Sequence, residues 1–79
     1  MTVLAFVMIN VKVGTDRETV ERLRALRGVK NCWEVYAVYD VVALVEVESM
    51  AELNDLVNSE IRKIGEVTST NTIIAEKFS

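Results

Sequence analysis

The middle of this 79-residue chain, residues 35–47, is rich in β-branched and aromatic residues. Such residues favour β-strands, and Asp40 is the only charged residue between Glu34 and Glu46. The run therefore predicts two strands joined by a tight turn at Tyr39-Asp40. A strand, helix and strand precede this hairpin and are repeated after it, so the hairpin joins two similar halves.

The first half predicts a strand over residues 3–13, a helix that ends near Arg27, and a strand from about residue 29 to Val38. Both alternating sets of positions are apolar at the start of the first strand, so both of its faces should be covered. Thr15-Asp16-Arg17-Glu18 matches the capping-box pattern that opens a helix, and Gly28 is expected to end that helix. Its buried side is expected to consist of Val20, Leu23 and Leu26.

The second half predicts a strand over Val41–Val47, a helix from Ser49 to Ile64, and a strand from Val67 to about Glu76. Ser49-Met50-Ala51-Glu52 repeats the capping-box pattern. The inward side chains of this helix are expected to be Met50, Leu53, either Leu56 or Val57, Ile61 and Ile64. The order βαββαβ predicts an α+β, ferredoxin-like fold in which two helices cover one face of a four-stranded antiparallel sheet.

The opposite face of such a sheet has no helix over it. The strands over residues 3–13 and 41–47 are expected to be the central pair, and both are apolar on both faces. The uncovered face would then expose a larger apolar area than soluble monomers usually do. We therefore expect two sheets to pack face to face as a dimeric α+β barrel, with further assembly into a higher homo-oligomer.

Charge and composition exclude several classes of partner. The formal net charge is -3, whereas a nucleic-acid surface needs clustered Lys and Arg. One cysteine, Cys32, cannot form an intrachain disulfide and is typical of the reducing cytoplasm. The apolar N-terminal run is broken at Asn10 and Lys12, so it predicts neither a signal peptide nor a membrane helix.

Side chains for common catalytic mechanisms are missing. The chain has no histidine, which excludes histidine general bases, catalytic triads and histidine-ligated metals. Cys32 lies on an apolar strand without a basic neighbour in sequence, so we interpret it as a small buried side chain and not as a nucleophile. We expect no cofactor, no metal site and no enzymatic activity.

Two polar features are not explained by packing alone. Asp40 lies at the turn, where it is either a turn former or a ligand contact. Thr68, Thr70 and Thr72 share one face of the last strand and form a row of hydroxyl groups. A surface strand explains this row equally well, because threonine favours strands. The alternative is a small polar binding site.

The residues around these two features resemble a known family. Val29-x-x-Cys32-Trp33-x-Val35-x-x-Val38-Tyr39-Asp40-Val41, followed by Glu66-Val67-x-x-Thr70-x-Thr72-Ile73-Ile74, is similar to the effector-binding (RAM) domain of the Lrp/AsnC, or feast/famine, transcription regulators. The resemblance covers essentially the whole chain. Two positions differ, because Ala37 and Glu66 stand where the family pattern has glycine.

The resemblance implies a function and a site. RAM domains of this family form dimers, the dimers form rings that are often octamers, and a free amino acid binds near the contact between dimers. Asp40 would hold the ammonium group of that amino acid, while threonine hydroxyls and backbone N–H groups would hold its carboxylate. The implied binding residues are Ala37, Val38, Tyr39, Asp40, Thr70 and Thr72.

The resemblance also implies a domain organisation. These regulators usually carry an N-terminal helix-turn-helix domain, whereas residue 1 here leads directly into the first strand. We therefore expect residues 1–79 to be a single RAM-like domain without a DNA-binding domain, and without direct contact to nucleic acid or membrane. Such a protein would sense an amino acid, oligomerise, and modulate a full-length Lrp/AsnC-type regulator.

Two other functions stay open at this point. Small cofactor-independent oxygenases also resemble the dimeric α+β barrel, but they need a polar pocket between helices and sheet. Only Asn31, Trp33 and Tyr36 could line such a pocket here. The second alternative is a purely structural assembly partner, whose oligomeric state would not respond to any amino acid.

Overall fold

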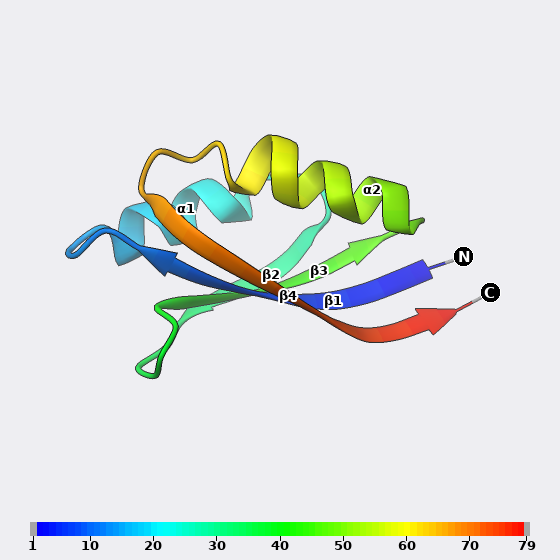
Figure 1. Cartoon of the computed structure of the whole chain (residues 1–79), viewed down its shortest axis with the longest axis horizontal. Coiled ribbons are helices and arrows are strands. Elements are labelled where there is room, and N and C mark those ends of the chain that lie inside the picture. Colours follow the sequence, from blue (N-terminus) through cyan, green and yellow to red (C-terminus); the bar gives the residue numbers. More distant parts are fainter. Residues whose placement is uncertain (1, 79) are drawn as a thin grey trace.

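The computed structural model describes residues 2–78, with side chains described as far as Ala75. The strands form one antiparallel sheet in the order β2-β3-β1-β4, so β1 and β3 are the central pair. This is the predicted ferredoxin-like fold. Its elements, shown in Figure 1, are β1 (Thr2–Val11), α1 (Asp16–Arg24), β2 (Val29–Glu34), β3 (Val41–Val47), α2 (Met50–Asp55), the π-helix η1 (Leu56–Ile61) and β4 (Val67–Phe78).

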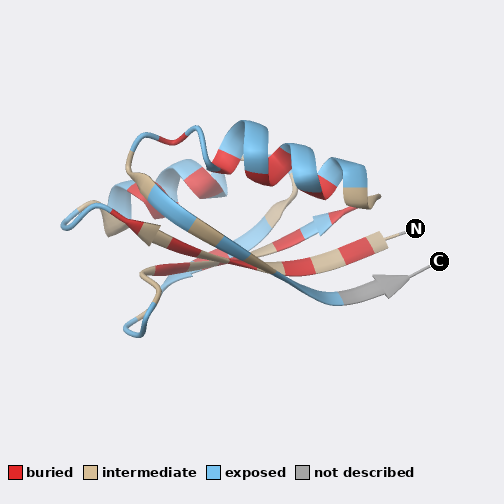
Figure 2. Ribbon diagram, viewed as in Figure 1, coloured by how far each residue is buried: buried red, intermediate tan, exposed pale blue. Residues whose placement is uncertain are grey.

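The helices lie on one face of the sheet (Figure 1). Every second residue of β1 and β3 is buried beneath them, as the alternating colours of these strands in Figure 2 show. The residues in between point to the other face, which no element of the described chain covers. We call this the open face, and its apolar side chains, placed by the strand register, are Leu4, Phe6, Met8, Trp33, Val42, Leu44 and Ile73.

The core lies between the helices and the sheet. On α1, Val20 and Leu23 are buried, and Leu26, which follows the end of α1 at Arg24, packs against the core, so the predicted inward residues are correct although the helix ends before Arg27. These side chains remove apolar surface from water, which is the main source of stability in a small domain. The second helical segment contributes Leu53, Leu56, Val57 and Ile61, and the turn after it contributes Ile64.

The capping box predicted at Thr15 is wrong. The Thr15 hydroxyl donates to the carbonyl oxygen of Lys12 at 2.7 Å, and no side-chain hydrogen bond caps α1. The strand before it ends at Val11, so Val13, which was predicted to be part of that strand, is fully exposed. The hydroxyl is turned towards Lys12, and the Thr15 backbone, at φ -107 and ψ 12, lacks the extended conformation that an N-cap residue usually has.

The second predicted capping box is present in a modified form. The Ser49 hydroxyl accepts a hydrogen bond from the Glu52 N–H at 3.1 Å. The Glu52 carboxylate accepts from the Glu48 N–H at 2.8 Å, one residue before the position that a capping box uses. Both bonds satisfy amide groups at the start of α2, so this helix begins where the sequence predicted.

The helix that follows Ser49 is regular only as far as Asp55. From Leu56 it continues as η1, in which the Arg62 N–H donates to the carbonyl oxygen of Val57, five residues earlier, at 2.9 Å. The wider π turn allows two consecutive side chains, Leu56 and Val57, to be buried together. The sequence predicts burial of only one of the two, because α-helical spacing places only one of them on the inward face.

The hairpin between β2 and β3 is not tight. β2 ends at Glu34, not at Val38, and residues 35–40 form an open loop, with the Val35 N–H donating to the Asp40 carbonyl oxygen at 2.9 Å. We call residues 35–40 the β2–β3 loop. It extends beyond the sheet on the side away from the helices (Figure 1). Two of its side chains are almost fully solvent-exposed, those of Tyr36 at 99% and Val38 at 82%.

Replacing Gly28 with alanine is expected to destabilise the fold. Gly28 has φ +99, and an added Cβ would lie 3.2 Å from Leu56 Cδ2 and 3.3 Å from Val47 Cγ1. Left-handed backbone strain alone costs an L-residue about 1–2 kcal/mol, so with the close contacts we expect Gly28→Ala to lower the free energy of unfolding by about 2 kcal/mol or more.

Gly65 provides the matched control for this prediction. No atom lies within 4 Å of a Cβ added there, and the φ of Gly65 is not positive. Gly65→Ala should therefore leave stability unchanged or raise it slightly. Urea unfolding of the two variants measures both effects, and equal stabilities would contradict the assigned role of Gly28.

Candidate functional site

Asp40 ends the pairing between β1 and β3. Its backbone N–H donates to the Ile9 carbonyl oxygen at 3.0 Å, and its carboxylate Oδ2 accepts from the Val11 N–H at 2.9 Å. The side chain thus continues the ladder at a position where β3 has no further backbone acceptor. A hydrogen bond to a charged group of this kind contributes about 1.5–3 kcal/mol.

Only part of the Asp40 carboxylate is used in this way. Oδ2 is bound to Val11, whereas no described residue donates a hydrogen bond to Oδ1. The side chain is half-buried at the base of the β2–β3 loop. Asp40 is therefore a turn former through one oxygen, and its other oxygen can accept a bond from a cation such as an ammonium group.

Tyr39 connects the β2–β3 loop to β4. Its hydroxyl oxygen accepts a hydrogen bond from Asn71 Nδ2 at 2.9 Å. In the register of the sheet, Asn71 pairs with Met8, so it lies on the open face. In the sheet, β3 and β4 lie on opposite sides of β1. The contact therefore joins the β2–β3 loop, which leads into β3, to the edge strand β4 across β1.

Thr70 and Thr72 lie on the other face of β4. Their partners on β1 are Ile9 and Val7, whose side chains are buried beneath the helices, and both threonines are half-buried. Thr68 stands in a β-bulge and pairs with no residue of β1, so the regular row of hydroxyls consists of two residues instead of the predicted three. Among the described residues, neither Thr70 nor Thr72 makes a side-chain hydrogen bond to the β2–β3 loop.

The six predicted binding residues thus form two groups in a single chain. The loop group is Ala37, Val38, Tyr39 and Asp40, of which Ala37 and Val38 are exposed at the tip. The strand group, Thr70 and Thr72, lies on the helix-covered face. The part of the chain that the structure describes encloses no cavity between them.

Sequence reasoning missed Asn71, which lies between the two predicted threonines. It also missed a similar contact two register positions along, where Asn10 Nδ2 donates to Ser69 Oγ at 3.1 Å. The available signal was the alternation of β4, which separates Ser69 and Asn71 from the threonines. Without the register, that alternation does not reveal which set faces the loop.

Comparison with known proteins decides the family. The model that describes the Lrp/AsnC ligand binding domain matches residues 4–77. This chain belongs to that family. The Lrp/AsnC ligand-binding domain is a regulatory module, and the sequence-based recognition of it is confirmed. A search of curated protein sequences found no match.

Solved structures agree with this assignment. FFRP-DM1 is 35% identical to this Lrp/AsnC domain, with a TM-score of 0.89 and coverage of 94% of this chain and 99% of the other. A hypothetical protein from Pyrococcus horikoshii is 33% identical, with a TM-score of 0.90 and coverage of 99% and 93%. The Neisseria meningitidis transcriptional regulator NMB0573, solved as a complex with L-Met, is 16% identical, with a TM-score of 0.84 and coverage of 95% and 50%, and it shows the shared fold alone.

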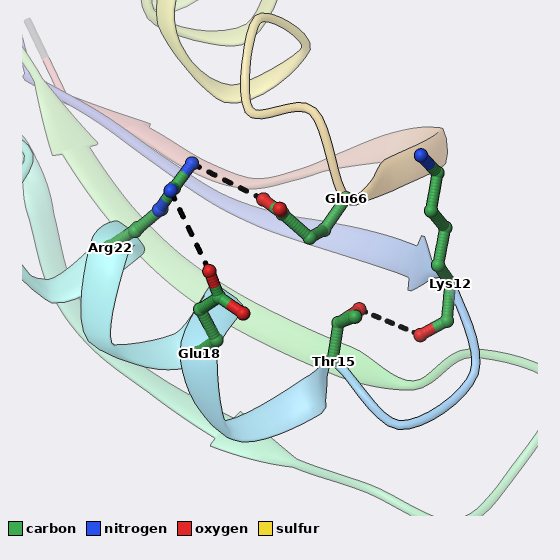
Figure 3. Close-up of polar contacts among 5 residues, drawn as sticks. All are labelled: Lys12, Thr15, Glu18, Arg22 and Glu66. Atoms are coloured by element: carbon green, nitrogen blue, oxygen red, sulfur yellow. Dashed lines mark hydrogen bonds and ion pairs between the residues drawn. The ribbon is translucent and has the colours of Figure 1, made fainter.

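Glu66 stands where the Lrp/AsnC pattern has glycine, and it has a structural role here. Its carboxylate pairs with the Arg22 guanidinium at 3.2 Å, and Arg22 also lies 3.6 Å from Glu18 within α1 (Figure 3). The Glu66 carbonyl oxygen accepts from the Lys12 N–H at 2.9 Å. The side-chain ion pair joins α1 to the start of β4, and an exposed pair of this kind contributes about 0–1 kcal/mol. The carbonyl contact, which a residue of any type could make at this position, joins the start of β4 to the end of β1.

Cys32 does not form a reactive site. It is fully buried, and its Sγ donates to the Val20 carbonyl oxygen at 3.5 Å. Burial raises the pKa of the Cys32 thiol, while Arg24, a basic neighbour that sequence reasoning missed, lowers it by a smaller amount. A buried thiol with a raised pKa is a poor nucleophile, since the thiolate is the reactive form.

The residues proposed for an oxygenase pocket do not point between helices and sheet. Asn31 and Trp33 pair with Leu44 and Val42 on the open face, and Tyr36 is solvent-exposed in the β2–β3 loop. The geometry therefore gives that alternative no support. Among residues 2–78, no helix has the length and hydropathy that crossing a membrane requires.

Proposed function

We propose that this domain senses a free amino acid and acts through its oligomeric state. The observation that carries the proposal is the Asp40 carboxylate, which the fold holds through Oδ2 while Oδ1 accepts no bond from any described residue. The L-Met complex of the related Neisseria meningitidis regulator supports the same class of ligand. In this function the protein is cytoplasmic, has no catalytic activity and uses no cofactor.

An amino acid has an ammonium group and a carboxylate, and the proposed residues offer partners for both. Asp40 Oδ1 would accept from the ammonium group, and exposed backbone N–H groups near Ala37 and Val38 would donate to the carboxylate. The Thr70 and Thr72 hydroxyls would complete the polar contacts. Two or three charge-assisted bonds of about 1.5–3 kcal/mol each suffice for a dissociation constant between micromolar and millimolar.

A second copy of the chain is part of this proposal. The threonines lie on the helix-covered face, whereas the loop extends on the side away from the helices (Figure 1), and the described part of the chain encloses no cavity between them. A ligand that contacts both groups would therefore take the loop from one copy and the threonines from another. In this proposal the two copies belong to neighbouring dimers, so the site lies at a contact between dimers, in a ring for which an octamer is one expected size.

Occupation of such a site would change assembly. A ligand that binds a contact between dimers stabilises every state in which the contact exists, in proportion to its difference in affinity between the states. The resulting shift in oligomeric state would be communicated to a full-length Lrp/AsnC-type regulator that shares the same fold. The module thus needs no DNA-binding surface of its own to affect transcription.

A thermal-shift panel of the twenty amino acids, with light scattering on each hit, tests this function. We expect a selective rise in melting temperature of a few degrees for one amino acid or a small group, accompanied by a change in molar mass. A flat panel with constant mass would contradict amino-acid sensing. That result would favour the purely structural assembly partner.

A further inference from the structure

Asn71 lies in an unusual position relative to the proposed site. It is the residue between Thr70 and Thr72, yet its side chain is on the open face, where its Nδ2 donates to the Tyr39 hydroxyl at 2.9 Å. One three-residue segment of β4 therefore contacts the β2–β3 loop on one face and presents the threonine hydroxyls on the other. A shift of this segment displaces both groups together.

The loop has few other attachments to the sheet. Backbone bonds fix its two ends, through the Val35 and Asp40 amide groups, and the Asp40 carboxylate binds Val11. Tyr36, Ala37 and Val38 are exposed. Of the side-chain hydrogen bonds that the structure describes, the one between Asn71 and Tyr39 is the only one that joins the loop to β4.

We propose that Asn71 is a positioning residue, which holds the β2–β3 loop, and through it the Asp40 carboxylate, in the orientation that binds the ligand. Asn71 itself does not contact the ligand in this proposal. Its amide fixes the neighbouring Tyr39 ring, and the adjacent peptide unit then orients Asp40 towards Val11. The consequence for amino-acid binding rests on the function proposed above, whereas the effect on the loop does not.

The hydrogen bond between Asn71 and Tyr39 lies on the open face, so the packing of a second copy there would also affect the loop. Asn71 is flanked on the open face by Met8, its partner on β1, and by Ile73, which is 48% exposed. Water competes for the Asn71 amide in a single chain, and packing of a second sheet on this face would remove that competition. Hydrogen bonds are stronger in such a low-dielectric environment, so assembly would hold the loop more firmly.

Amide hydrogen exchange measured by NMR on Asn71→Leu tests the proposal without any ligand. Leucine keeps the volume of the side chain and removes the hydrogen bond. We expect the Val11 and Asp40 amides to exchange about fivefold faster than in the wild type, the factor that corresponds to loss of one typical hydrogen bond. The Glu46 amide, which donates to the Gly28 carbonyl oxygen far along the sheet, should be unchanged.

Ser69→Ala is the matched control. Ser69 lies on β4, on the same face as Asn71 and two residues before it. The substitution removes the hydrogen bond that Ser69 accepts from Asn10, and Ser69 makes no described hydrogen bond to the loop. In Ser69→Ala, the Val11 and Asp40 amides should exchange within twofold of the wild-type rates. Equal acceleration in both variants, or none in Asn71→Leu, would overturn the proposal, because the bond to Tyr39 would then have no specific effect on the loop.

A rescue experiment separates positioning from general stability. In Asn71→Asp the carboxylate accepts from the Tyr39 hydroxyl, so the contact is retained with its direction reversed. We expect the exchange of the Val11 and Asp40 amides to return to within twofold of the wild type. In a Tyr39→Phe background the same substitution should give no protection, and protection there would contradict a role through Tyr39.

Binding provides the last measurement. With the amino acid that gives the largest thermal shift as probe, Asn71→Leu should bind about fivefold more weakly and Ser69→Ala should bind normally. If the panel is flat, the exchange rates still decide the role of Asn71, and only the sensing function fails. If an amino acid binds but Asn71→Leu affects neither exchange nor affinity, the sensing function stands and the positioning role fails.

Discussion

Asp40→Asn should lower the free energy of unfolding by no more than about 1 kcal/mol, and should bind the amino-acid effector about tenfold more weakly, or worse. The asparagine carbonyl oxygen can still accept from the Val11 N–H, which the wild-type carboxylate binds at 2.9 Å. The negative charge that would attract the ammonium group is lost. Charged hydrogen bonds contribute about 1–2 kcal/mol more than neutral ones, which corresponds to a factor of about ten in affinity.

Asp40→Ala distinguishes the two functions of the residue. Alanine leaves the part-buried Val11 N–H without its acceptor, so we expect the free energy of unfolding to fall by about 1–3 kcal/mol in addition to the loss of binding. Urea unfolding and isothermal titration of both variants provide the comparison. Wild-type affinity in Asp40→Asn would show that the ammonium group is held elsewhere and would remove Asp40 from the site.

The central strands could be predicted from the sequence because each is buried by its neighbours on both sides. β1 and β3 have apolar residues at both alternating sets of positions, and such strands occupy the middle of a sheet. The boundaries of β3, Val41 and Val47, agree with the prediction. Burial on the helix face and partial burial on the open face both favour the same strand, so local preference and tertiary packing do not compete there.

The β2–β3 loop could not be predicted because its residues favour a strand on their own. Tyr36 and Val38 have high β propensity, which measures how well a side chain fits a pleated, half-buried surface. Here that surface is missing. The Val35 N–H donates to the Asp40 carbonyl oxygen, and no described backbone hydrogen bond is made by residues 36–39, so these residues lie outside the sheet.

The local patterns at the two helix starts succeeded only where the N-cap residue has an extended backbone, as Ser49 does at φ -155 and ψ 164. The Ser49 hydroxyl is free to accept from Glu52, so the predicted cap forms. The Thr15 hydroxyl instead donates to Lys12 across the turn, a contact that depends on the path of the chain after β1. In the same way, the pair Leu56 and Val57 is buried through a π turn that helical spacing does not reveal.

The proposed site shows the same limit. Its residue types were recognisable from a family pattern, but their distribution over two faces follows from the register between β1 and β4, in which Thr70 pairs with Ile9 and Asn71 with Met8. Sequence alternation separates these residues into two sets but does not assign the sets to faces. The connection from Asn71 to Tyr39 therefore had to come from the structure.

The second large effect is expected from a charge on the open face. Leu44 pairs with Phe6 at the centre of this face, among half-buried apolar side chains. If two copies pack through it, Leu44→Glu places a carboxylate without a partner in a desolvated interface. An uncompensated buried charge costs about 3–5 kcal/mol, so the dimer should dissociate at least about 100-fold more readily.

Asn54→Glu is the control for this experiment, because it adds the same charge at an exposed position of α2 on the helix-covered side. Sedimentation velocity over a range of protein concentrations measures both variants. We expect Asn54→Glu to retain the wild-type mass and Leu44→Glu to sediment as a monomer at concentrations where the wild type is assembled. An unchanged mass for Leu44→Glu would exclude the open face as the contact between copies, and the hydrogen bond from Asn71 to Tyr39 would then remain exposed to water in the assembly.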